Sequence, residues 1–445
     1  MNHELIQRYA GPVPRYTSYP TANHFTPDVT ADDYRAWLSA VPNGEPLSLY
    51  VHVPFCKEMC WYCGCSTKAV RRYEPIAEYL KSLTIEIANV ASLLPSGRET
   101  THLHWGGGSP NMLAAADIGR LAEDIRTRFN VSSRAEFAVE VDPRGVTDER
   151  VAAFADAGVN RVSIGVQDFN DDVQKAISRI QPFDLTRRVI EKFRDRGVKG
   201  INIDLVYGLP HQTRRSVDET IRQVLCLTPD RIAIFGYAHL PARIRHQRLI
   251  DDASLPDAVE RFGQSSRLAR ILEAEGYVRV GLDHFARAND RLATGCINRN
   301  FQGYTTDTAE HLIGLGASSI GSLAEGYIQN AVAVSDYARR IEEVGLATVR
   351  GARLTDDDRA RRFAIERLMC DFNLPAAELQ RRFGEAAAPV LADAEALAAA
   401  DLDNLIIRSE TGYSVTARGR PFVRTIASCL DTHLDSTKGI HSSSV

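Results

Sequence analysis

Short apolar runs, rich in β-branched and aromatic residues, recur between residues 47 and 282. Most of them are separated by stretches in which apolar residues alternate at spacings of three and four, as in Pro75–Leu94 and Ala114–Asn130. That spacing predicts helices that each turn one apolar face towards a sheet. The runs themselves are expected as strands: Leu47–Phe55, Thr101–Trp105, Glu136–Val141, Arg161–Val166, Gly200–Tyr207, Arg231–Tyr237 and Val278–Leu282.

This alternation continues for about 240 residues and is typical of a parallel sheet with right-handed crossovers. We therefore predict an α/β fold, with a partial or near-complete parallel (β/α) barrel over residues 47–350. The segments on either side of residues 47–350 do not show this alternation of strands and helices. Residues 1–46 are expected as an N-terminal arm or lid, residues 351–435 as a mainly helical C-terminal domain, and residues 436–445 as a disordered polar tail.

The arm is irregular apart from one expected short helix near Ala31–Ala40. It contains the motif PRYTSYPTA at Pro14–Ala22, which is dense in turn-forming and aromatic residues. Such a segment could fold over a cavity as a lid. Its composition, with two tyrosines and an arginine, favours a wrap over the protein surface instead.

The C-terminal region combines helices with one hairpin, an arrangement that resembles a winged-helix domain. In isolation this pattern could indicate DNA binding, but the region has no basic patch, so a structural or lid role is favoured. The expected elements are helices at Asp356–Cys370, Pro375–Phe383, Glu385–Ala400 and Arg420–His433, and a hairpin at Leu405–Thr416.

The composition is that of an ordinary globular protein, with 44% hydrophobic and 25% charged residues in 445. The net charge of -4 gives no electrostatic footprint for nucleic acid. No run approaches the roughly 18 apolar residues of a membrane span, and the polar start MNHELIQRYA is not a secretory signal. Eight cysteines in so long a chain do not make a disulfide framework, and free thiols indicate a reducing cytoplasm. The scattered cysteines are expected as small buried residues: Cys226, Cys296, Cys370 and Cys429.

The other four cysteines lie together in the stretch CKEMCWYCGC, directly after the first predicted strand. Cys56, Cys60 and Cys63 have the spacing CxxxCxxC, and Cys65 follows two residues later. Closely spaced thiolates on one loop are what an iron–sulfur cluster needs. Three cysteines on a four-iron cluster leave one iron open for a substrate or cofactor, which favours catalysis over plain electron transfer.

Three other interpretations of this cysteine loop were weighed. A zinc site usually takes four ligands as two separated pairs, and the sequence has no second pair. A redox dithiol needs only CxxC, and a disulfide scaffold is typical of short secreted chains. Zinc is the main alternative to the cluster.

Unusual polar residues follow the predicted strands, one strand after another. Because active sites of parallel strand–helix folds lie at the carboxyl ends of the strands, these residues are expected to meet in one site. Gly106–Gly108 in HWGGGSP form a backbone that can approach a ligand and present amide hydrogens to a carboxylate. The polar groups at the later strand ends are Glu140, Asp142, Arg144, Gln167, Asp168, Asp204, Tyr237 and His239.

With these motifs, the chain resembles the oxygen-independent coproporphyrinogen III oxidases of the radical S-adenosylmethionine (radical SAM) superfamily. The resemblance covers nearly the whole chain. The cysteine motif alone indicates only the superfamily, whereas the arm motif, Cys65 and NFQGYTT are much narrower. The matching segments are PRYTSYPTA, YVHVPFCKEMCWYCGC, HWGGGSPNML, EVDPRG, GVQDFN, NIDLVYGLP, YAHLP, DHFAR and RNFQGYTT.

The resemblance implies a [4Fe–4S] cluster on Cys56, Cys60 and Cys63, with two S-adenosylmethionine molecules nearby. The first would contact Tyr50, Gly107, Glu140 and Ile320. The second would contact Tyr62, which is usually Phe in the family, and Gly108, Ser109, Gln167, Arg179, Asp204 and Ala238. Tyr50, His52, Cys65 and Gln302 match positions expected to be catalytic. Arg15, Phe301 and Gln302 are expected to face the substrate, with Arg15 binding a carboxylate.

The implied reaction converts two propionate side chains of coproporphyrinogen III to vinyl groups and gives protoporphyrinogen IX. A 5′-deoxyadenosyl radical from S-adenosylmethionine would remove hydrogen from the propionate β-carbon, and carbon dioxide and one electron would then be lost. A flavodoxin or ferredoxin system would supply electrons to a cytoplasmic monomer. Ala288–Asn298 is shorter than usual in the family, holds an unexpected Cys296, and is expected to border the second cofactor site.

Three other functions were considered. A haem-trafficking relative normally carries an aromatic residue where Cys65 stands and lacks the arm motif. A haem-degrading relative would need its own partner residues. A non-catalytic metal-binding or DNA-binding module would show neither cluster absorbance nor S-adenosylmethionine cleavage.

Overall fold

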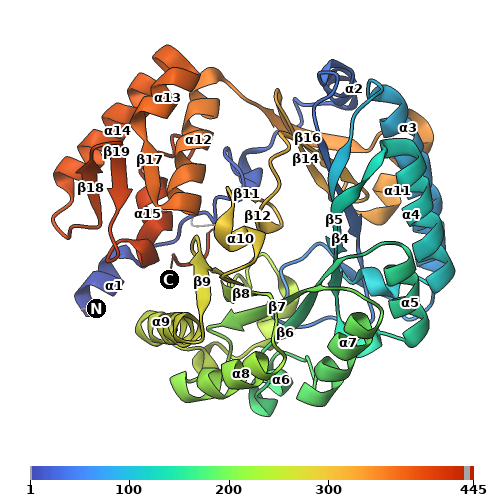
Figure 1. Ribbon diagram of the computed structural model, residues 1–445, viewed down its shortest axis with the longest axis horizontal. Coiled ribbons are helices and arrows are strands. Elements are labelled where there is room, and N and C mark those ends of the chain that lie inside the picture. The colour runs from blue at the N-terminus through green and yellow to red at the C-terminus, as the bar shows by residue number, and fades with distance from the viewer. Residues whose placement is uncertain (1–2, 435–440, 445) are drawn as a thin grey trace.

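The protein is described by a computed structural model, which covers residues 3–434 and 441–444. Its centre is a 12-stranded sheet (Figure 1). Adjacent strands in the middle of the sheet run parallel, which confirms the predicted α/β architecture. In spatial order they are β13 (His311–Leu315), β1 (Leu47–Val53), β4 (Thr100–Gly107), β5 (Val131–Val141), β6 (Arg161–Gln167), β7 (Gly200–Tyr207) and β8 (Arg231–Gly236).

The register places the carboxyl ends of these strands at one edge. Val53 on β1 lies level with Gly107 on β4, and Tyr207 on β7 lies level with Gly236 on β8. Loops that follow different strands are therefore brought together although they lie far apart in the sequence. This edge is where the predicted site residues are expected to meet.

The outer strands of the sheet are antiparallel to their neighbours. One side ends in β14 (Ile320–Leu323), β15 (Gly326–Asn330) and β16 (Thr348–Arg353), and the other in β10 (His284–Arg287) and β9 (Tyr277–Val280). The run expected as a further parallel strand at residues 278–282 is thus β9, which pairs only with β10. In the described part of the chain no pairing joins β16 to β9, so the barrel is partial.

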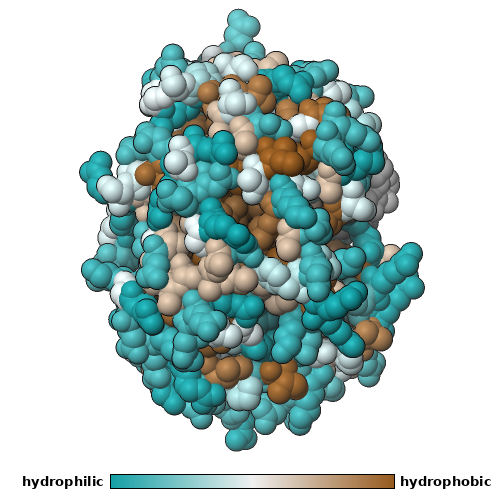
Figure 2. Space-filling view, turned by 90° about the vertical axis from the view of Figure 1, so that its right-hand side faces the viewer, coloured by the Kyte–Doolittle hydropathy of each residue, from teal (hydrophilic) through white to brown (hydrophobic). Residues whose placement is uncertain are grey.

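Helices cover the outer side of the sheet, as Figure 1 shows for α3 (Glu74–Leu93) and α4 (Ala115–Phe129). The predicted apolar stripe of α3 is buried, with Ile76 and Leu83 fully out of contact with solvent. The outer face itself is largely hydrophilic, with smaller hydrophobic areas among the polar side chains (Figure 2). The other helices around the sheet are α5 (Asp148–Asp156), α6 (Asp171–Ala176), α7 (Phe183–Asp195), α8 (Arg214–Cys226), α9 (Ala258–Ala274) and α11 (Val334–Val344).

Short elements lie in the loops of the barrel. They are β2 (Phe55–Cys56), β3 (Lys68–Ala69), α10 (Arg291–Thr294), β11 (Asn298–Asn300) and β12 (Gly303–Thr305). None of the helices in the described ranges is long and apolar enough to cross a membrane.

The C-terminal region packs around its own hydrophobic cluster beside the barrel (Figure 1). The predicted hairpin is present, and its strands join a third in the order β17-β19-β18. The last helix ends at Ser428, well before the predicted His433. The elements are α12 (Asp356–Asp371), β17 (Asn373–Pro375), α13 (Ala376–Phe383), α14 (Ala387–Ala400), β18 (Ile406–Ser409), β19 (Gly412–Val415) and α15 (Val423–Ser428).

The N-terminal arm is not a surface wrap. Besides the expected α2 (Ala31–Ala40) it forms α1 (His3–Tyr9), which the sequence analysis missed. Tyr16 and Tyr19 are buried in the hydrophobic cluster of the C-terminal region, and the Tyr16 hydroxyl donates to Asp431 at 3.0 Å. Composition suggested exposure because it does not reveal contacts with distant residues such as Asp431, which lies 415 positions after Tyr16.

Two further expectations need correction. His441–Ser444 of the predicted disordered tail are ordered, and Ser443 forms a β-bridge with Pro12 of the arm. The rest of that prediction, at residues 436–440 and 445, lies outside the described residues. Of the four scattered cysteines only Cys370 is buried, whereas Cys226, Cys296 and Cys429 are exposed.

Candidate active site

The carboxyl ends of the parallel strands open on one cavity of about 680 Å³. Its walls come from the cysteine loop, the glycine loop and the ends of β5 to β8, together with β11, β12 and one residue of the arm. A hollow of about 720 Å³ over α6 and α8 is open to the surface and contains no predicted site residue. The predicted residues that line the 680 Å³ cavity are Arg15, Cys56, Cys60, Tyr62, Cys63, Cys65, Gly107, Gly108, Ser109, Glu140, Asp142, Arg144, Gln167, Arg179, Asp204, Tyr237, Ala238, Phe301 and Gln302.

The other predicted site residues, Tyr50, His52 and Ile320, do not line this cavity. The Tyr50 hydroxyl hydrogen-bonds His52 Nδ1 at 3.0 Å, and His52 Nε2 hydrogen-bonds the Ser66 carbonyl at 2.9 Å. Because a carbonyl only accepts, Nε2 carries the proton and Nδ1 accepts from Tyr50. Burial lowers the pKa of His52, so the ring is neutral. Ile320 on β14 packs with Phe301 in a small hydrophobic cluster.

The three motif cysteines are free thiols with different surroundings. Cys56 Sγ lies 3.2 Å from the Thr67 hydroxyl, and burial raises its pKa. Cys60 Sγ accepts hydrogen bonds from Arg144 Nη2 at 3.2 Å and Arg179 Nη1 at 3.5 Å. Cys60 therefore has two positively charged donors at its sulfur, on the side of the loop that faces the cavity.

The third cysteine, Cys63, accepts a hydrogen bond from the Cys65 amide at 3.4 Å. Hydrogen bonding from Cys65 lowers the pKa of Cys63 to about 6, and it raises the pKa of Cys65 well above its usual value. The two neighbouring thiols therefore differ: Cys63 ionises readily, and Cys65 stays protonated. This difference agrees with a ligand role for Cys63 and a separate role for Cys65.

The spacing of the cysteine sulfurs can be compared with that around a single ion. Four thiolates at the Zn–S distance of about 2.3 Å lie roughly 3.8 Å apart. Among the described residues, only Glu45, Glu310 and His311 place three ligand atoms within 4.8 Å of one another. The sulfurs of Cys56, Cys60 and Cys63 therefore do not all lie within 4.8 Å of one another.

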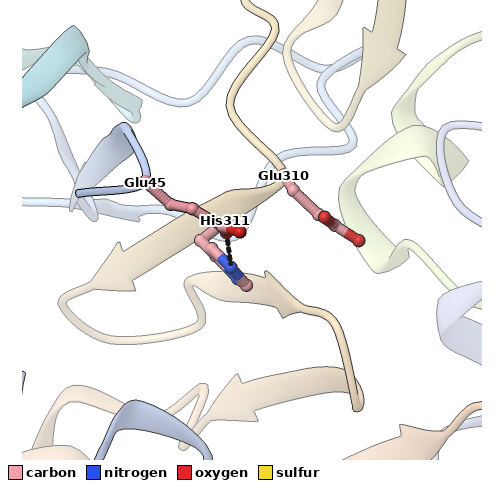
Figure 3. A group of neighbouring side chains, drawn as sticks. All are labelled: Glu45, Glu310 and His311. Atoms are coloured by element: carbon pink, nitrogen blue, oxygen red, sulfur yellow. Dashed lines mark hydrogen bonds and ion pairs between the residues drawn. The ribbon is translucent and has the colours of Figure 1, made fainter. Parts of the chain in front are cut away.

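The group of Glu45, Glu310 and His311 (Figure 3) lies at the amino end of β13, the end opposite the cavity. His311 is buried and bonds Glu45 through Nε2 at 2.8 Å, whereas the exposed Glu310 side chain extends to one side. The arrangement is a hydrogen-bonded pair at the amino end of the strand with an exposed acid beside it.

The amides of the glycine loop donate hydrogen bonds to other groups of the protein. The Gly107 amide donates to Glu140 Oε2 at 3.1 Å, and the Gly108 amide donates to the Val53 carbonyl at 2.9 Å. The expected presentation of these amides to a ligand carboxylate is therefore wrong. A Cβ atom on Gly107, which has a φ of 107°, would lie 2.5 Å from the His52 ring.

Acidic and basic side chains are paired along the cavity wall. Burial pushes the pKa of Glu140 upwards, but hydrogen bonds from His104 at 3.1 Å and from the Gly107 amide outweigh it and leave the pKa below its usual value. Asp142 accepts from Arg144 Nη2 at 2.6 Å and Arg179 Nη1 at 3.3 Å. These two cations overcome burial and lower the pKa of Asp142 to about 2, so Glu140 and Asp142 are ionised.

Two other strand-end residues face the same cavity. Asp204 accepts from the Ser163 hydroxyl at 2.7 Å and Asn202 Nδ2 at 2.8 Å, while burial raises its pKa. Gln167 has a φ of 68°, a left-handed conformation that is uncommon for a residue with a side chain. Strained backbone of this kind is concentrated at functional sites.

Several residues of the site were not predicted as such. The Thr67 hydroxyl contacts the Cys56 sulfur, and His246 and Gln247 bond the backbone of the cysteine loop at the carbonyls of Cys63 and Tyr62. Arg144, which bonds the Cys60 sulfur, was predicted from its place at a strand end, two positions after Asp142. Thr67, His246 and Gln247 lie in loops with no motif of their own.

Residues 50–224 match the Radical SAM superfamily, and residues 354–422 match the HemN C-terminal domain. The oxygen-independent coproporphyrinogen III oxidase of Bradyrhizobium diazoefficiens is 46% identical over 97% of each chain. The enzyme of the same name from Paracoccus denitrificans is 42% identical over 99% of this chain and 98% of the relative.

The fold of a solved structure agrees with these sequence matches. The coproporphyrinogen III oxidase (HemN) of Escherichia coli, described as a radical SAM enzyme, superimposes with a TM-score of 0.90. The match has 38% sequence identity and covers 97% of this chain and 99% of that one. The similarity thus includes the arm, the barrel and the C-terminal region.

Proposed function

The chain belongs to the oxygen-independent coproporphyrinogen III oxidases of the radical SAM superfamily, and we propose that it converts coproporphyrinogen III to protoporphyrinogen IX. Two propionate side chains would each lose carbon dioxide, two electrons and a proton to become vinyl groups. The observation that carries the proposal is the full-length similarity together with three cysteines of one loop opening on an enclosed, charged cavity. Anaerobic turnover of coproporphyrinogen III, followed by mass spectrometry of the products, tests it.

The family implies a [4Fe–4S] cluster and S-adenosylmethionine, and the donor set fits both. Cys56, Cys60 and Cys63 would hold the cluster, since they are free thiols on one loop and all three line the cavity. When bound, the two groups supply the one-electron chemistry that activates an unreactive C–H bond. The two guanidinium groups on Cys60 keep positive charge at the cluster edge, which favours the reduced, more negative state.

The chain's own residues would orient the cofactor. Glu140 is ionised and fixed by two donors, so its free lone pairs can accept hydrogen bonds from ribose hydroxyls or an ammonium group. Asp204 and Gln167 offer further acceptors on the adjacent strands. Cys65, protonated and beside the cluster loop, can deliver a hydrogen atom or proton to a group in the cavity.

Two S-adenosylmethionine molecules are proposed for one cavity. The first would use Tyr50, Gly107, Glu140 and Ile320. Gly107 and Glu140 line the cavity, whereas Tyr50 and Ile320 do not. The second would use Tyr62, Gly108, Ser109, Gln167, Arg179, Asp204 and Ala238, all of which line the cavity. Equilibrium dialysis against labelled S-adenosylmethionine should give about two molecules per reconstituted chain, and the Asp204→Leu variant should retain one.

The substrate is a tetracarboxylate and needs cations around it. Arg15 reaches from the arm to the cavity and donates through Nη2 to the Gly236 carbonyl at 2.5 Å. Phe301 and Gln302 line the same wall beside it. The Arg15→Ala variant should raise KM or lower turnover with an intact cluster, and unchanged kinetics would remove Arg15 from the substrate site. A flavodoxin or ferredoxin as electron donor and a monomeric state are further parts of the proposal.

A further inference from the structure

Gln247 stands where two segments of the cavity wall meet, the cysteine loop and the loop after β8. It lies in the 3-10 helix η4 (Arg245–Leu249), and it lines the 680 Å³ cavity although only 1% of the residue is exposed. Burying an amide costs free energy unless its polar atoms find partners. The partners of this side chain therefore show what its position achieves.

The side-chain amide of Gln247 joins the two segments through their backbones. Its Oε1 accepts a hydrogen bond from the Leu240 amide at 2.6 Å. Its Nε2 donates to the Tyr62 carbonyl at 2.9 Å and to the Ala238 carbonyl at 3.1 Å. Because an amide nitrogen donates and a carbonyl oxygen accepts, these partners fix which way the side chain points. Leu240 and Ala238 belong to the loop after β8, whereas Tyr62 belongs to the cysteine loop, 185 positions before Gln247.

Both N–H donors of Gln247 are used within the protein. An amide NH2 group carries two hydrogens, and the two carbonyls take them. The residue therefore affects a ligand in the cavity through the backbone that it holds, rather than by donating to the ligand itself. A carboxylate in its place would set acceptors against both carbonyls, so the amide is specifically required.

The preceding residue bonds the cysteine loop in the same way. His246 Nε2 lies 2.6 Å from the Cys63 carbonyl, and Nε2 carries the proton because a carbonyl only accepts. Two consecutive side chains of η4 thus hold two consecutive carbonyls of the loop, those of Tyr62 and Cys63. The loop is also held from Trp61, whose amide donates to the Ile177 carbonyl at 2.9 Å. Trp61 and Tyr62 both pack against the apolar cluster that contains Ile177.

We propose that Gln247 is a positioning residue that holds Tyr62 and Ala238 together as two walls of the second S-adenosylmethionine subsite. The inference rests on the proposed function, in which both residues contact that molecule. They come from different segments, so the width of a subsite between them depends on what joins the segments. One nitrogen bonded to both backbone carbonyls sets that width, and the burial of Gln247 keeps the nitrogen in place.

The first subsite is independent of this link. Its proposed residues lie on β1, β4, β5 and β14, and the three hydrogen bonds of the Gln247 side chain reach none of them: Tyr50, Gly107, Glu140 and Ile320. Loss of Gln247 should therefore weaken one of two binding events. A general loss of stability would weaken both, and this difference separates a positioning role from a merely structural one.

The test uses the full-length, anaerobically reconstituted protein, kept oxidised so that S-adenosylmethionine is not cleaved. Equilibrium dialysis measures binding of labelled S-adenosylmethionine to the wild type, Gln247→Met and Gln247→Glu. Methionine removes all three hydrogen bonds, whereas glutamate keeps an acceptor for Leu240 and lacks the NH2 donors. The matched control is Gln264→Met. Gln264 is fully buried, bonds the Gly208 amide and the Gln212 carbonyl, and does not line the cavity.

Both Gln247 variants should raise one of the two dissociation constants about tenfold and leave the other unchanged, as the loss of buried hydrogen bonds predicts. Gln264→Met should change neither constant, with melting temperature and iron per chain measured for all variants. In the Asp204→Leu background, which should retain only the first subsite, Gln247→Met should have no further effect. Two unchanged constants in both Gln247 variants, or an equal rise in both constants, would overturn the proposal. A wild type that binds a single molecule would overturn it together with the second subsite.

Hydrogen exchange of the apoprotein needs neither cluster nor cofactor, and it decides if the variants take up no iron. The Leu240 amide should exchange faster in Gln247→Met, which removes its acceptor, and stay protected in Gln247→Glu. Peptides from residues 56–65 should exchange faster in both variants than in the wild type or Gln264→Met, and unchanged exchange there would overturn the proposal. Neither readout depends on turnover, so a wild type that makes no vinyl product would contradict the proposed oxidase activity alone.

Discussion

Arg144 donates a hydrogen bond from Nη2 to the sulfur of Cys60 at 3.2 Å. The same nitrogen also bonds Asp142, which holds the guanidinium in place at 2.6 Å. A fixed cation on a ligand sulfur stabilises added negative charge, and hydrogen bonds to sulfur are one of the ways in which proteins set cluster potentials. Arg144 therefore links the end of the third parallel strand to the electronic state of the cluster site.

The Arg144→Met variant should keep its iron but show a more negative midpoint potential, because the reduced cluster loses a neighbouring positive charge. Turnover should fall about tenfold or more, the usual effect of removing a partner of a metal ligand. EPR-monitored redox titration measures the potential. Arg128→Met removes an arginine of α4 that pairs with Asp124 away from the site, and should leave the potential unchanged. An equal potential in wild type and Arg144→Met would contradict the assignment.

The cysteines should separate into ligands and a non-ligand. Cys60→Ala should lose nearly all iron and sulfide, whereas Cys65→Ala should keep both, since Cys65 is held as a protonated thiol beside Cys63. Chemical iron and sulfide analysis after reconstitution measures this, with the exposed Cys226→Ala as control. Loss of the cluster in Cys65→Ala would mean that four cysteines bind it and that no iron is open.

Two glycine substitutions should change stability in opposite directions. Gly107→Ala places a Cβ 2.5 Å from His52 at a φ of 107° and should cost about 2 kcal/mol or more. Gly119 lies within α4 with nothing within 4 Å of a built Cβ, so Gly119→Ala should stabilise by about 0.5–1 kcal/mol. Urea unfolding of the apoprotein measures both. The same sign for the two would contradict the close packing of the glycine loop.

Glu86 should make stability pH-dependent. It is buried, and accepts from Asn330 Nδ2 at 2.6 Å and the Tyr337 hydroxyl at 2.7 Å. Burial outweighs these donors and raises its pKa from 4.5 to about 7. The folded state therefore holds a proton that the unfolded state releases, and the free energy of unfolding should fall by about 3 kcal/mol as pH rises from about 4.5 through 7.

Unfolding of the apoprotein at a series of pH values measures this effect. Glu86→Gln should remove most of the slope in that window, because an amide does not titrate. The exposed Glu123→Gln on α4 should keep the wild-type slope. A slope in Glu86→Gln equal to that of the wild type would assign the effect to another group.

Most of the barrel could be predicted because its elements are long and periodic. The strand predicted at residues 200–207 coincides with β7, and the helical spacing in α4 corresponds to a buried stripe that includes Ile118 and Ile125. The convergence of Glu140, Gln167 and Asp204 followed from one rule, that parallel strands end at one edge. Predicting that these three residues converge required no knowledge of the loop conformations.

The rest depended on contacts between distant segments. The antiparallel strands β14 to β16 are short and follow a segment without clear periodicity, and α1 has only seven residues. Burial of Tyr16 and Tyr19 depends on residues beyond 360 in the chain, which composition does not reveal. A second, smaller cavity is lined by arginines from five segments, and no two of these arginines are close neighbours in the sequence: Arg15, Arg261, Arg279, Arg299 and Arg424.

The most direct test of the account is the stoichiometry of one anaerobic reaction. The reconstituted, reduced protein is mixed with S-adenosylmethionine and coproporphyrinogen III, and the porphyrin products and 5′-deoxyadenosine are quantified by mass spectrometry. Two decarboxylations, each using one radical, predict about two molecules of 5′-deoxyadenosine per protoporphyrinogen IX. Cleavage of S-adenosylmethionine without any vinyl product would contradict the proposed substrate and indicate a radical SAM enzyme that acts on a different molecule.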